Sequence, residues 1–161
     1  MADERLKMRA MVLWQEAYQA QMIGDLDRAV DLYTKSIEVM PSAEAYTFRG
    51  WAYSYMGRID DAVAECHKAI AIDPGFGNPY NDIGAYLMAK GELDEAIEWL
   101  EKAKQAPRYQ PRHFPFMNLG RVYEAKGMVL KAIEEFEGAL RFEPDNLSCR
   151  RKLAELRAML N

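Results

Sequence analysis

Two segments in the second half of the chain nearly repeat each other. They read AKGELDEAIEWLEKA at Ala89–Ala103 and AKGMVLKAIEEFEGA at Ala125–Ala139, and eight of their fifteen positions are identical. Weaker copies, MIGDLDRAVDLYTKS and YMGRIDDAVAECHKA, occupy residues 22–36 and 55–69. All four copies carry a glycine at the same place: Gly24, Gly57, Gly91 and Gly127. These glycines follow one another at intervals of 33, 34 and 36 residues. Periods of this length are typical of a solenoid of stacked supersecondary units.

Each unit reads as a helical hairpin. In residues 77–112 a first apolar stripe recurs at helical spacing, formed by Tyr80, Ile83, Gly84 and Leu87. Gly91 follows, where a glycine can end a helix in the left-handed conformation without strain. A second helical stripe then begins, formed by Leu93, Ala96, Ile97, Leu100 and Ala103. We therefore expect every unit to be a pair of antiparallel α-helices.

Small residues recur at equivalent places in the four units. The first helices carry Ala17, Gly50, Gly84 and Gly120, and the second helices carry Ala29, Ala62, Ala96 and Ala132. A second small column consists of Ser36, Ala69, Ala103 and Ala139. Without bulk at these positions, paired helices can approach closely, and larger side chains fill the remaining gaps. Three of the units close with a proline, which cannot continue a helix: Pro41, Pro74 and Pro144.

Together, the small, aromatic, glycine and proline columns resemble the tetratricopeptide repeat, a helix–turn–helix unit of about 34 residues. The resemblance implies an all-α, right-handed superhelical solenoid of antiparallel hairpins, with the whole chain, 1–161, as one domain. We expect four repeats and a C-terminal capping helix, at residues 10–42, 43–76, 77–112, 113–146 and 147–160. One side of the last segment is apolar and the other is charged, as a terminal cap requires.

Composition and motifs exclude several classes of function. The net charge of −4 comes from interspersed acids and bases, so no basic face for nucleic acid is expected. No apolar run is long enough for a signal peptide or a membrane span. Two cysteines without a CxxC motif suggest neither a disulfide framework nor a zinc site. No catalytic or phosphate-binding motif is present. We expect a cytoplasmic protein that is not an enzyme and needs no cofactor or metal.

The connection after the third unit departs from the pattern. The sequence QAPRYQPRHFP contains Pro107, Pro111 and Pro115, and this unit is two residues longer than the family period. Loops tolerate insertions at little energetic expense, so a neutral insertion is the simpler interpretation. The alternative is a lip on a binding surface, with four side chains available to a ligand: Arg108, Tyr109, Arg112 and His113.

The resemblance also implies a function. In tetratricopeptide arrays the first helices line a concave groove that holds a partner's peptide. Carried over to this chain, the candidate groove residues are Trp14, Tyr18, Phe48, Trp51, Tyr55, Asp82, Met117, Asn118 and Arg121. Trp14 and Tyr18 could instead be core between repeats, packed on Phe48 and Trp51. Trp51, beside Gly50, is the better candidate for an exposed aromatic.

One subtype of groove does not fit these residues. Arrays that bind the acidic C-terminus of heat-shock chaperones use lysine, asparagine and arginine on consecutive first helices. Neither possible alignment supplies those cations here, and Asp82 would repel a carboxylate. Two functions remain open: an adaptor that binds an apolar or aromatic peptide of another protein, and a structural unit that self-associates through its first helix or groove into a homo-oligomer.

Overall fold

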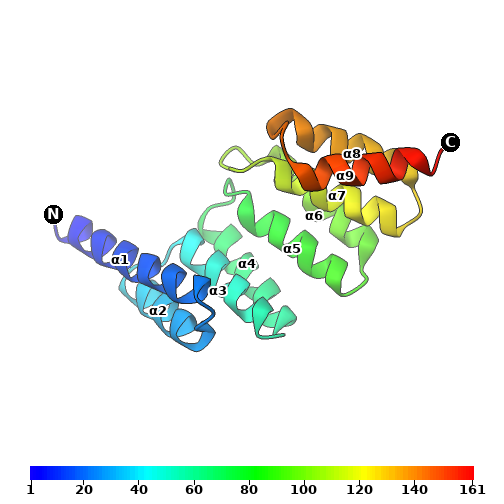
Figure 1. The fold of residues 1–161 in the computed structure, drawn as a ribbon. Coiled ribbons are helices and arrows are strands. Elements are labelled where there is room, and N and C mark those ends of the chain that lie inside the picture. The colour runs from blue at the N-terminus through cyan, green and yellow to red at the C-terminus, as the bar shows by residue number, and fades with distance from the viewer.

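The computed structural model describes residues 1–161 and contains nine α-helices and no β-strand. In chain order they are α1 (Ala2–Met22), α2 (Leu26–Val39), α3 (Ala43–Tyr55), α4 (Ile59–Ile72), α5 (Asn78–Ala89), α6 (Leu93–Gln105), α7 (His113–Ala125), α8 (Val129–Phe142) and α9 (Leu147–Ala158). Helices α1 to α8 form four successive pairs, and α9 packs against α8 at the far end of the stack (Figure 1). The expected all-α solenoid of hairpins is confirmed.

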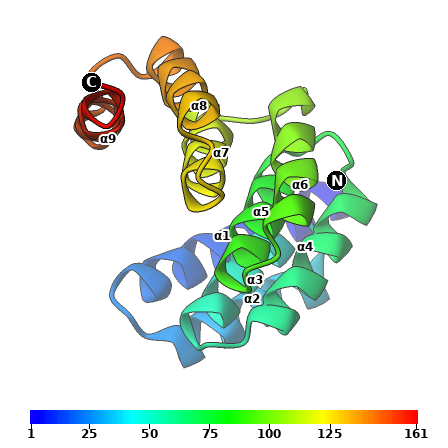
Figure 2. The same ribbon diagram turned by 90° about the vertical axis from the view of Figure 1, so that its right-hand side faces the viewer.

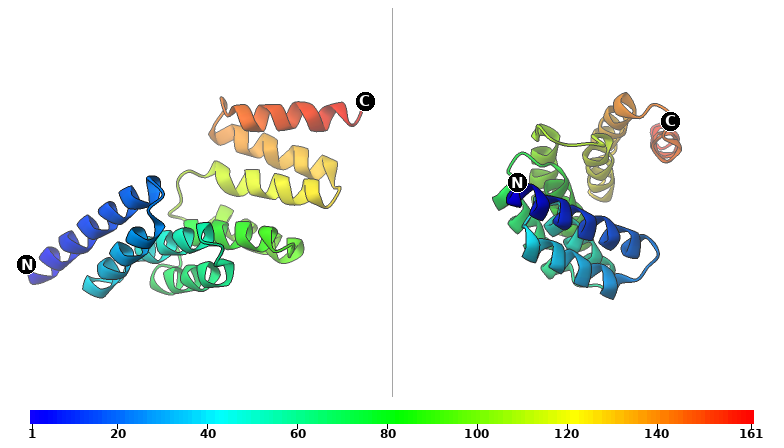
Figure 3. Two further views of the ribbon diagram at one scale, coloured as in Figure 1. Left: turned by 60° about the horizontal axis from the view of Figure 1, so that its bottom comes forward. Right: turned by 90° about the vertical axis from the view of Figure 1, so that its left-hand side faces the viewer.

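The helices form two layers, one of odd-numbered and one of even-numbered helices, which differ in how closely their members contact one another. Along the stack, α1 contacts α3, α3 contacts α5, and α5 contacts α7. The even-numbered helices make no comparable contacts with one another. Because the odd-numbered helices lie closer together, their side of the stack is the inner, concave side. Successive pairs turn relative to one another in Figure 2, and both views of Figure 3 place the two chain termini at opposite ends.

The four repeated glycines end the first helix of each pair, as the sequence predicts. Their φ angles are 84°, 79°, 80° and 74°, all in the left-handed region, and no other residue type has a positive φ. At Gly91 this conformation lets the amide of Glu92 reach the carbonyl of Leu87 at 2.9 Å. The last carbonyls of α5 are thereby satisfied, and the chain reverses into α6 within three residues.

Small residues mark the places where paired helices touch. A Cβ atom added to Gly84 would lie 2.5 Å from Cγ of Leu100, and one added to Gly120 would lie 2.6 Å from the ring of Phe136. Ala96, in the matching second-helix column, is completely buried. The predicted close approach of the helices is therefore confirmed.

The connection between α6 and α7 folds back onto the connection between α4 and α5. The amide of Gly77 donates to the carbonyl of Arg108, and the amide of Arg108 donates to the carbonyl of Gly75, both at 3.0 Å. The guanidinium of Arg108 bridges two acids, with nitrogens 2.7 Å from Asp73 and 2.8 Å from Glu44 at the start of α3. We call residues 106–112 the fold-back connector.

The alternative interpretation of this connection, a lip with its side chains available to a ligand, does not hold for Tyr109 and His113. Tyr109 is only 4% exposed because its ring occupies the space next to Gly77, where a Cβ would lie 2.3 Å from it. His113 is 7% exposed, and its Nε2 lies 3.0 Å from the carboxylate of Glu143. Arg112 donates hydrogen bonds to the carbonyls of Ala106 and Pro107. The connector is therefore a packed element of the fold, although part of its outer edge still faces the concave side.

Candidate functional site

A continuous row of aromatic rings crosses the concave layer from α1 to α3. Trp14 and Tyr18 are stacked, with centroids 5.9 Å apart and planes at 15°. The edge of Phe48 meets both rings, at 5.3 Å and 5.7 Å. Trp51 lies 5.8 Å beyond Phe48, and Tyr55 lies 5.6 Å beyond Trp51. We call these five residues the aromatic row.

The members of the aromatic row differ in exposure. Tyr55 is 63% exposed and Tyr18 is 37% exposed. Trp51, expected to be the exposed aromatic, is half-buried, as are Trp14 and Phe48. Trp14 and Phe48 also pack against the buried cluster that contains Ala17, Tyr33 and Ala52. Trp14 therefore belongs both to the contact between repeats and to the row, and the two interpretations made from the sequence are compatible.

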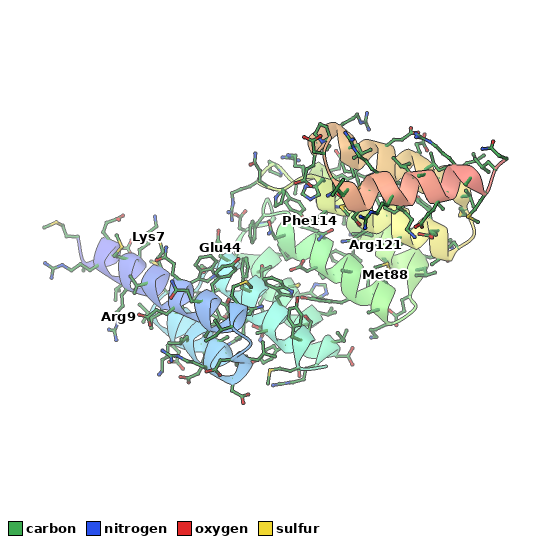
Figure 4. All side chains as sticks on the ribbon, in the orientation of Figure 1. Lys7, Arg9, Glu44, Met88, Phe114 and Arg121 are labelled. Atoms are coloured by element: carbon green, nitrogen blue, oxygen red, sulfur yellow. The ribbon has the colours of Figure 1, made fainter.

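A polar network continues the same surface from α5 to α7. The side-chain amide of Asn118 donates to the side-chain oxygen of Asn81, and Arg121 donates to the oxygen of Asn118, both at 3.0 Å. Asn81 and Asn118 are each only 7% exposed, whereas Arg121 is exposed. Figure 4 labels Phe114 and Arg121 of α7 and Met88 of α5. The concave surface is thus aromatic in its first half and polar in its second half.

Asp82 sits where the two halves meet. Its carboxyl is half-buried, and burial raises its pKa to about 7 although the nearby Asn81 side chain lowers it. The carboxylate contributes to the raised pKa values of Cys66, Tyr86 and Tyr109, after the larger effect of burial in each case. These three residues come from α4, α5 and the fold-back connector. The groups that Asp82 affects are thus weak acids, and no basic side chain contributes to its own pKa shift.

Tyr86, whose pKa Asp82 helps to raise, was not among the residues predicted from the sequence. It is 7% exposed, and its hydroxyl forms no hydrogen bond of normal geometry, although Ser54 lies close enough to lower its pKa. The available signal was its spacing of four residues from Asp82, which places both side chains on one face of α5.

Met117 does not lie on the accessible surface, contrary to the expectation. It is 6% exposed and belongs to the buried cluster that contains Cys149, Leu153 and Leu156 of α9. The side-chain nitrogen of Asn146, which precedes α9, lies 3.8 Å from its sulfur. The cap covers the position that a further repeat would cover, so Met117 contributes to the core.

Two clefts border the aromatic row. One, of about 500 Å³, lies between the row and the fold-back connector and is lined by Trp14, Phe48, Arg108 and Gln110 among others. The other, of about 520 Å³, lies beside the first half of α1 and is lined by Met11, Trp14, Met40 and Ile72 together with charged residues. Glu44 lines both clefts and is marked in Figure 4 near the meeting of α1 and α3.

The rest of the molecule holds no metal-binding cluster and no exposed thiol. No group of three or more histidine, cysteine, aspartate and glutamate side chains is arranged to hold a metal ion. The two thiols, Cys66 and Cys149, are fully buried and far apart in the chain, and burial raises the pKa of both. None of the nine helices is both long and apolar enough to pass through a lipid bilayer.

The chain belongs to the tetratricopeptide repeat family, whose profiles match residues 43–76, 80–106 and 116–146. Among curated proteins it is similar to small glutamine-rich tetratricopeptide repeat-containing protein 2 of Mycosarcoma maydis, with 34% identity over 102 residues, or 63% of this chain and 29% of that protein. It is also similar to heat shock protein STI1 of Saccharomyces cerevisiae, with 33% identity over 91 residues, or 55% of this chain and 15% of that protein. The chain thus spans under a third of either relative.

Among solved structures, pilF of Pseudomonas aeruginosa superimposes with a TM-score of 0.88 at 26% identity. The match covers 94% of this chain and 68% of that chain. Proteins of this repeat class bind other proteins, and the class to which the chain belongs is therefore one of interaction modules.

Proposed function

We propose that this protein is a non-enzymatic adaptor that binds a peptide segment of a partner protein in its concave groove. The observation that carries the proposal is the aromatic row, which runs unbroken across two repeats and leaves Tyr18 and Tyr55 partly open to solvent. Exposed aromatic side chains of this kind supply rigid, amphipathic contact area, and such residues dominate the energetics of many interfaces.

The proposed ligand is not the acidic C-terminus that a carboxylate clamp would hold. Such a clamp needs several cations on consecutive first helices. In the groove Arg121 is exposed, whereas Arg49 of α3 is bound to Glu65 and cannot serve. Asp82 would repel a terminal carboxylate. Although one curated relative is a heat shock protein, we propose an apolar or aromatic peptide as the ligand.

The test begins with isolation of a partner by affinity capture and mass spectrometry, followed by titration of the binding segment as a synthetic peptide. Trp51→Ala should weaken binding by about 2 kcal/mol, roughly thirtyfold, because the indole is a central member of the row. Arg121→Ala should have a smaller effect but should reduce the salt dependence of binding.

Glu134→Ala is the matched control, since this side chain is exposed on α8, away from the concave layer. It should bind as tightly as wild type. Unchanged affinity in a folded Trp51→Ala variant would place the binding site elsewhere and overturn the proposal.

A second candidate function is self-association through α1. Four apolar side chains on the first half of this helix are each 44–57% exposed: Leu6, Met8, Met11 and Val12. Sedimentation at micromolar concentration decides between the two functions, because a clean monomer contradicts self-association.

We further propose that residues 1–161 form one domain of four repeats and a cap, and that the protein works in the cytoplasm.

A further inference from the structure

We infer that the cleft between the aromatic row and the fold-back connector binds an acidic side chain of the partner's peptide, with an apolar side chain next to it in the sequence. The inference rests on the proposed function, because it names the chemistry of the ligand for the same groove. It starts from the two walls of this cleft, whose volume of about 500 Å³ lies in the usual range of ligand-binding clefts.

The walls of the cleft come from different parts of the fold. On the helical side lie Trp14 and Phe48, two members of the aromatic row. On the other side lie Arg108, Gln110 and Arg112 of the fold-back connector, whose side chains all carry N–H donors. One wall therefore suits an apolar side chain, and the other suits a group that accepts hydrogen bonds.

Arg112 is a half-buried cation without a carboxylate partner. Its Nη2 donates to the carbonyl oxygens of Ala106 and Pro107 at 3.0 and 3.1 Å, and its Nη1 lies 3.5 Å from the carbonyl oxygen of Lys104. Carbonyl oxygens carry only partial negative charges, so the formal charge of Arg112 has no ionic counterpart within the protein. A partly desolvated charge is stabilised when an opposite charge is brought to it.

Arg108 is held rigidly at the same wall. Its Nε and Nη2 bind Asp73 at 3.0 and 2.7 Å, its Nη1 binds Glu44 at 2.8 Å, and its Cζ lies 4.2 Å from the centre of the Phe76 ring. A guanidinium has five N–H groups, so two of them remain without a partner, and the side chain is 50% exposed. Arg108 can therefore act as a second, preorganised donor beside Arg112.

Positive charge exceeds negative charge among the residues that line the cleft. Arg108 and Arg112 are its cations, and Glu44 is its only acid. Asp73, the second acid bound to Arg108, lines the neighbouring cleft instead. Asp82, which would repel a carboxylate over α5, does not line this cleft. Charge complementarity therefore selects a carboxylate, which accepts several N–H donors at once, over a basic or neutral group.

An extended peptide can satisfy both walls with two consecutive residues. Successive side chains of an extended chain point to opposite sides. An apolar side chain directed at the aromatic row therefore places the next side chain toward the connector. The recognised element is thus an apolar residue next to an aspartate or glutamate within the peptide, which is distinct from a C-terminal carboxylate.

The probe is a library of N-acetylated, C-amidated decapeptides, so that no terminal carboxylate is present. The central position holds aspartate, glutamate, asparagine, glutamine or lysine. Its neighbours on both sides are leucine, phenylalanine or tryptophan, and the remaining positions are serine or asparagine. Binding is measured by fluorescence anisotropy for wild type, Arg112→Gln, Glu44→Gln, Arg121→Gln and Arg28→Gln. Thermal midpoints followed by circular dichroism show which variants are folded.

Wild type should bind the aspartate and glutamate peptides about tenfold more tightly than the asparagine and glutamine peptides. Arg112→Gln should lose most of this preference while still binding the neutral peptides. Glu44→Gln should raise the preference several-fold, because the cleft then has no acid of its own while Asp73 still holds Arg108. A gain of this kind cannot come from damage to the fold, so Glu44→Gln tests the inference independently of the stability of Arg112→Gln.

Two variants serve as matched controls, each with the same loss of charge as Arg112→Gln. Arg121→Gln alters the exposed cation of α7, and Arg28→Gln alters an exposed arginine of α2. Both should keep the preference for acidic peptides.

Three results would overturn the inference and leave the adaptor function intact. They are a wild type without a preference for acidic peptides, a preference that persists in folded Arg112→Gln or does not rise in Glu44→Gln, and a loss of the preference in either control. Failure of wild type to bind any of the peptides would contradict the proposed function itself.

Discussion

Arg49 on α3 and Glu65 on α4 form an ion pair of 2.6 Å in which the two side chains are only 13% and 5% exposed. Arg49 also donates to the hydroxyl of Thr34 on α2 at 3.1 Å, and Lys68 donates to the second oxygen of Glu65 at 3.0 Å. The pair therefore joins three helices across the boundary between two repeats. Gly50 lies next to this pair: a Cβ atom added to Gly50 would be 3.1 Å from the Cβ atom of Glu65.

Glu65→Ala should destabilise the protein by about 3–5 kcal/mol, because it leaves the guanidinium of Arg49 buried without its partner. The double variant Arg49→Met/Glu65→Leu should lose much less stability, since apolar side chains of similar size need no compensation. Urea unfolding followed by circular dichroism measures both. Equal losses in the single and double variants would show that packing, rather than the unpaired charge, sets the effect.

Gly84→Ala should destabilise the protein by about 1–3 kcal/mol, because the new methyl group collides with Leu100. In a Leu100→Ala background, where that contact is absent, the same substitution should have little effect. Gly91→Ala is the matched control. No atom lies within 4 Å of its Cβ, but its φ of 80° is strained for alanine, which costs about 1 kcal/mol in either background. Additive losses for Gly84 and Leu100 would contradict the close-contact explanation.

Tyr109→Ala should destabilise the protein by about 3 kcal/mol, as expected for removal of a large buried aromatic side chain. Gln110→Ala, at the exposed neighbouring position, should change the stability by less than about 0.5 kcal/mol. Thermal or urea unfolding distinguishes the two. If both variants were as stable as wild type, the connector would be the neutral insertion that the sequence favours as the simpler interpretation.

The free energy of unfolding should depend on pH because the pKa of Asp82 is raised in the folded protein. Its pKa is 3.8 in a solvated reference and about 7 in the folded protein, so the folded state binds the proton more tightly than the unfolded state does. Wild type should therefore lose stability as the pH rises from about 4 to 7, and should level off above that range. Allowing for partial contact with solvent, Asp82→Asn should be more stable than wild type by about 2 kcal/mol at pH 8. The two proteins should be equally stable near pH 4.

The sequence predicts those features that depend on one unit and its repetition. The left-handed glycines such as Gly91, the contact at Gly84 and the buried Ala96 all follow from columns that recur in register. The prediction that Met117 is accessible, and the alternative that made Tyr109 and His113 available to a ligand, failed for a common reason. Periodicity identifies the face of a helix on which a residue lies, but it does not identify what covers that face. At Met117 the cover is α9, and at Tyr109 it is the backbone of a distant connection.

The surroundings of Asp82 could not be predicted from the sequence, for a related reason. Burial beneath other elements raises its pKa, and Asp82 in turn contributes to the raised pKa values of Cys66, Tyr86 and Tyr109, which belong to three different elements. A charge count along one helix contains neither piece of information.

The fold-back connector should change the order in which the repeats of this array unfold. In a simple array each repeat touches its neighbours alone, so the ends can fray one hairpin at a time. Here the link between two neighbouring hairpins is tightened, because Arg108, at the end of the third hairpin, is bonded both to Glu44 at the start of the second and to Asp73 at its end. Opening the third hairpin must therefore disturb both ends of the second. The middle of the chain should exchange its amide hydrogens as one cooperative block, while α1 and α9 exchange independently at the two ends.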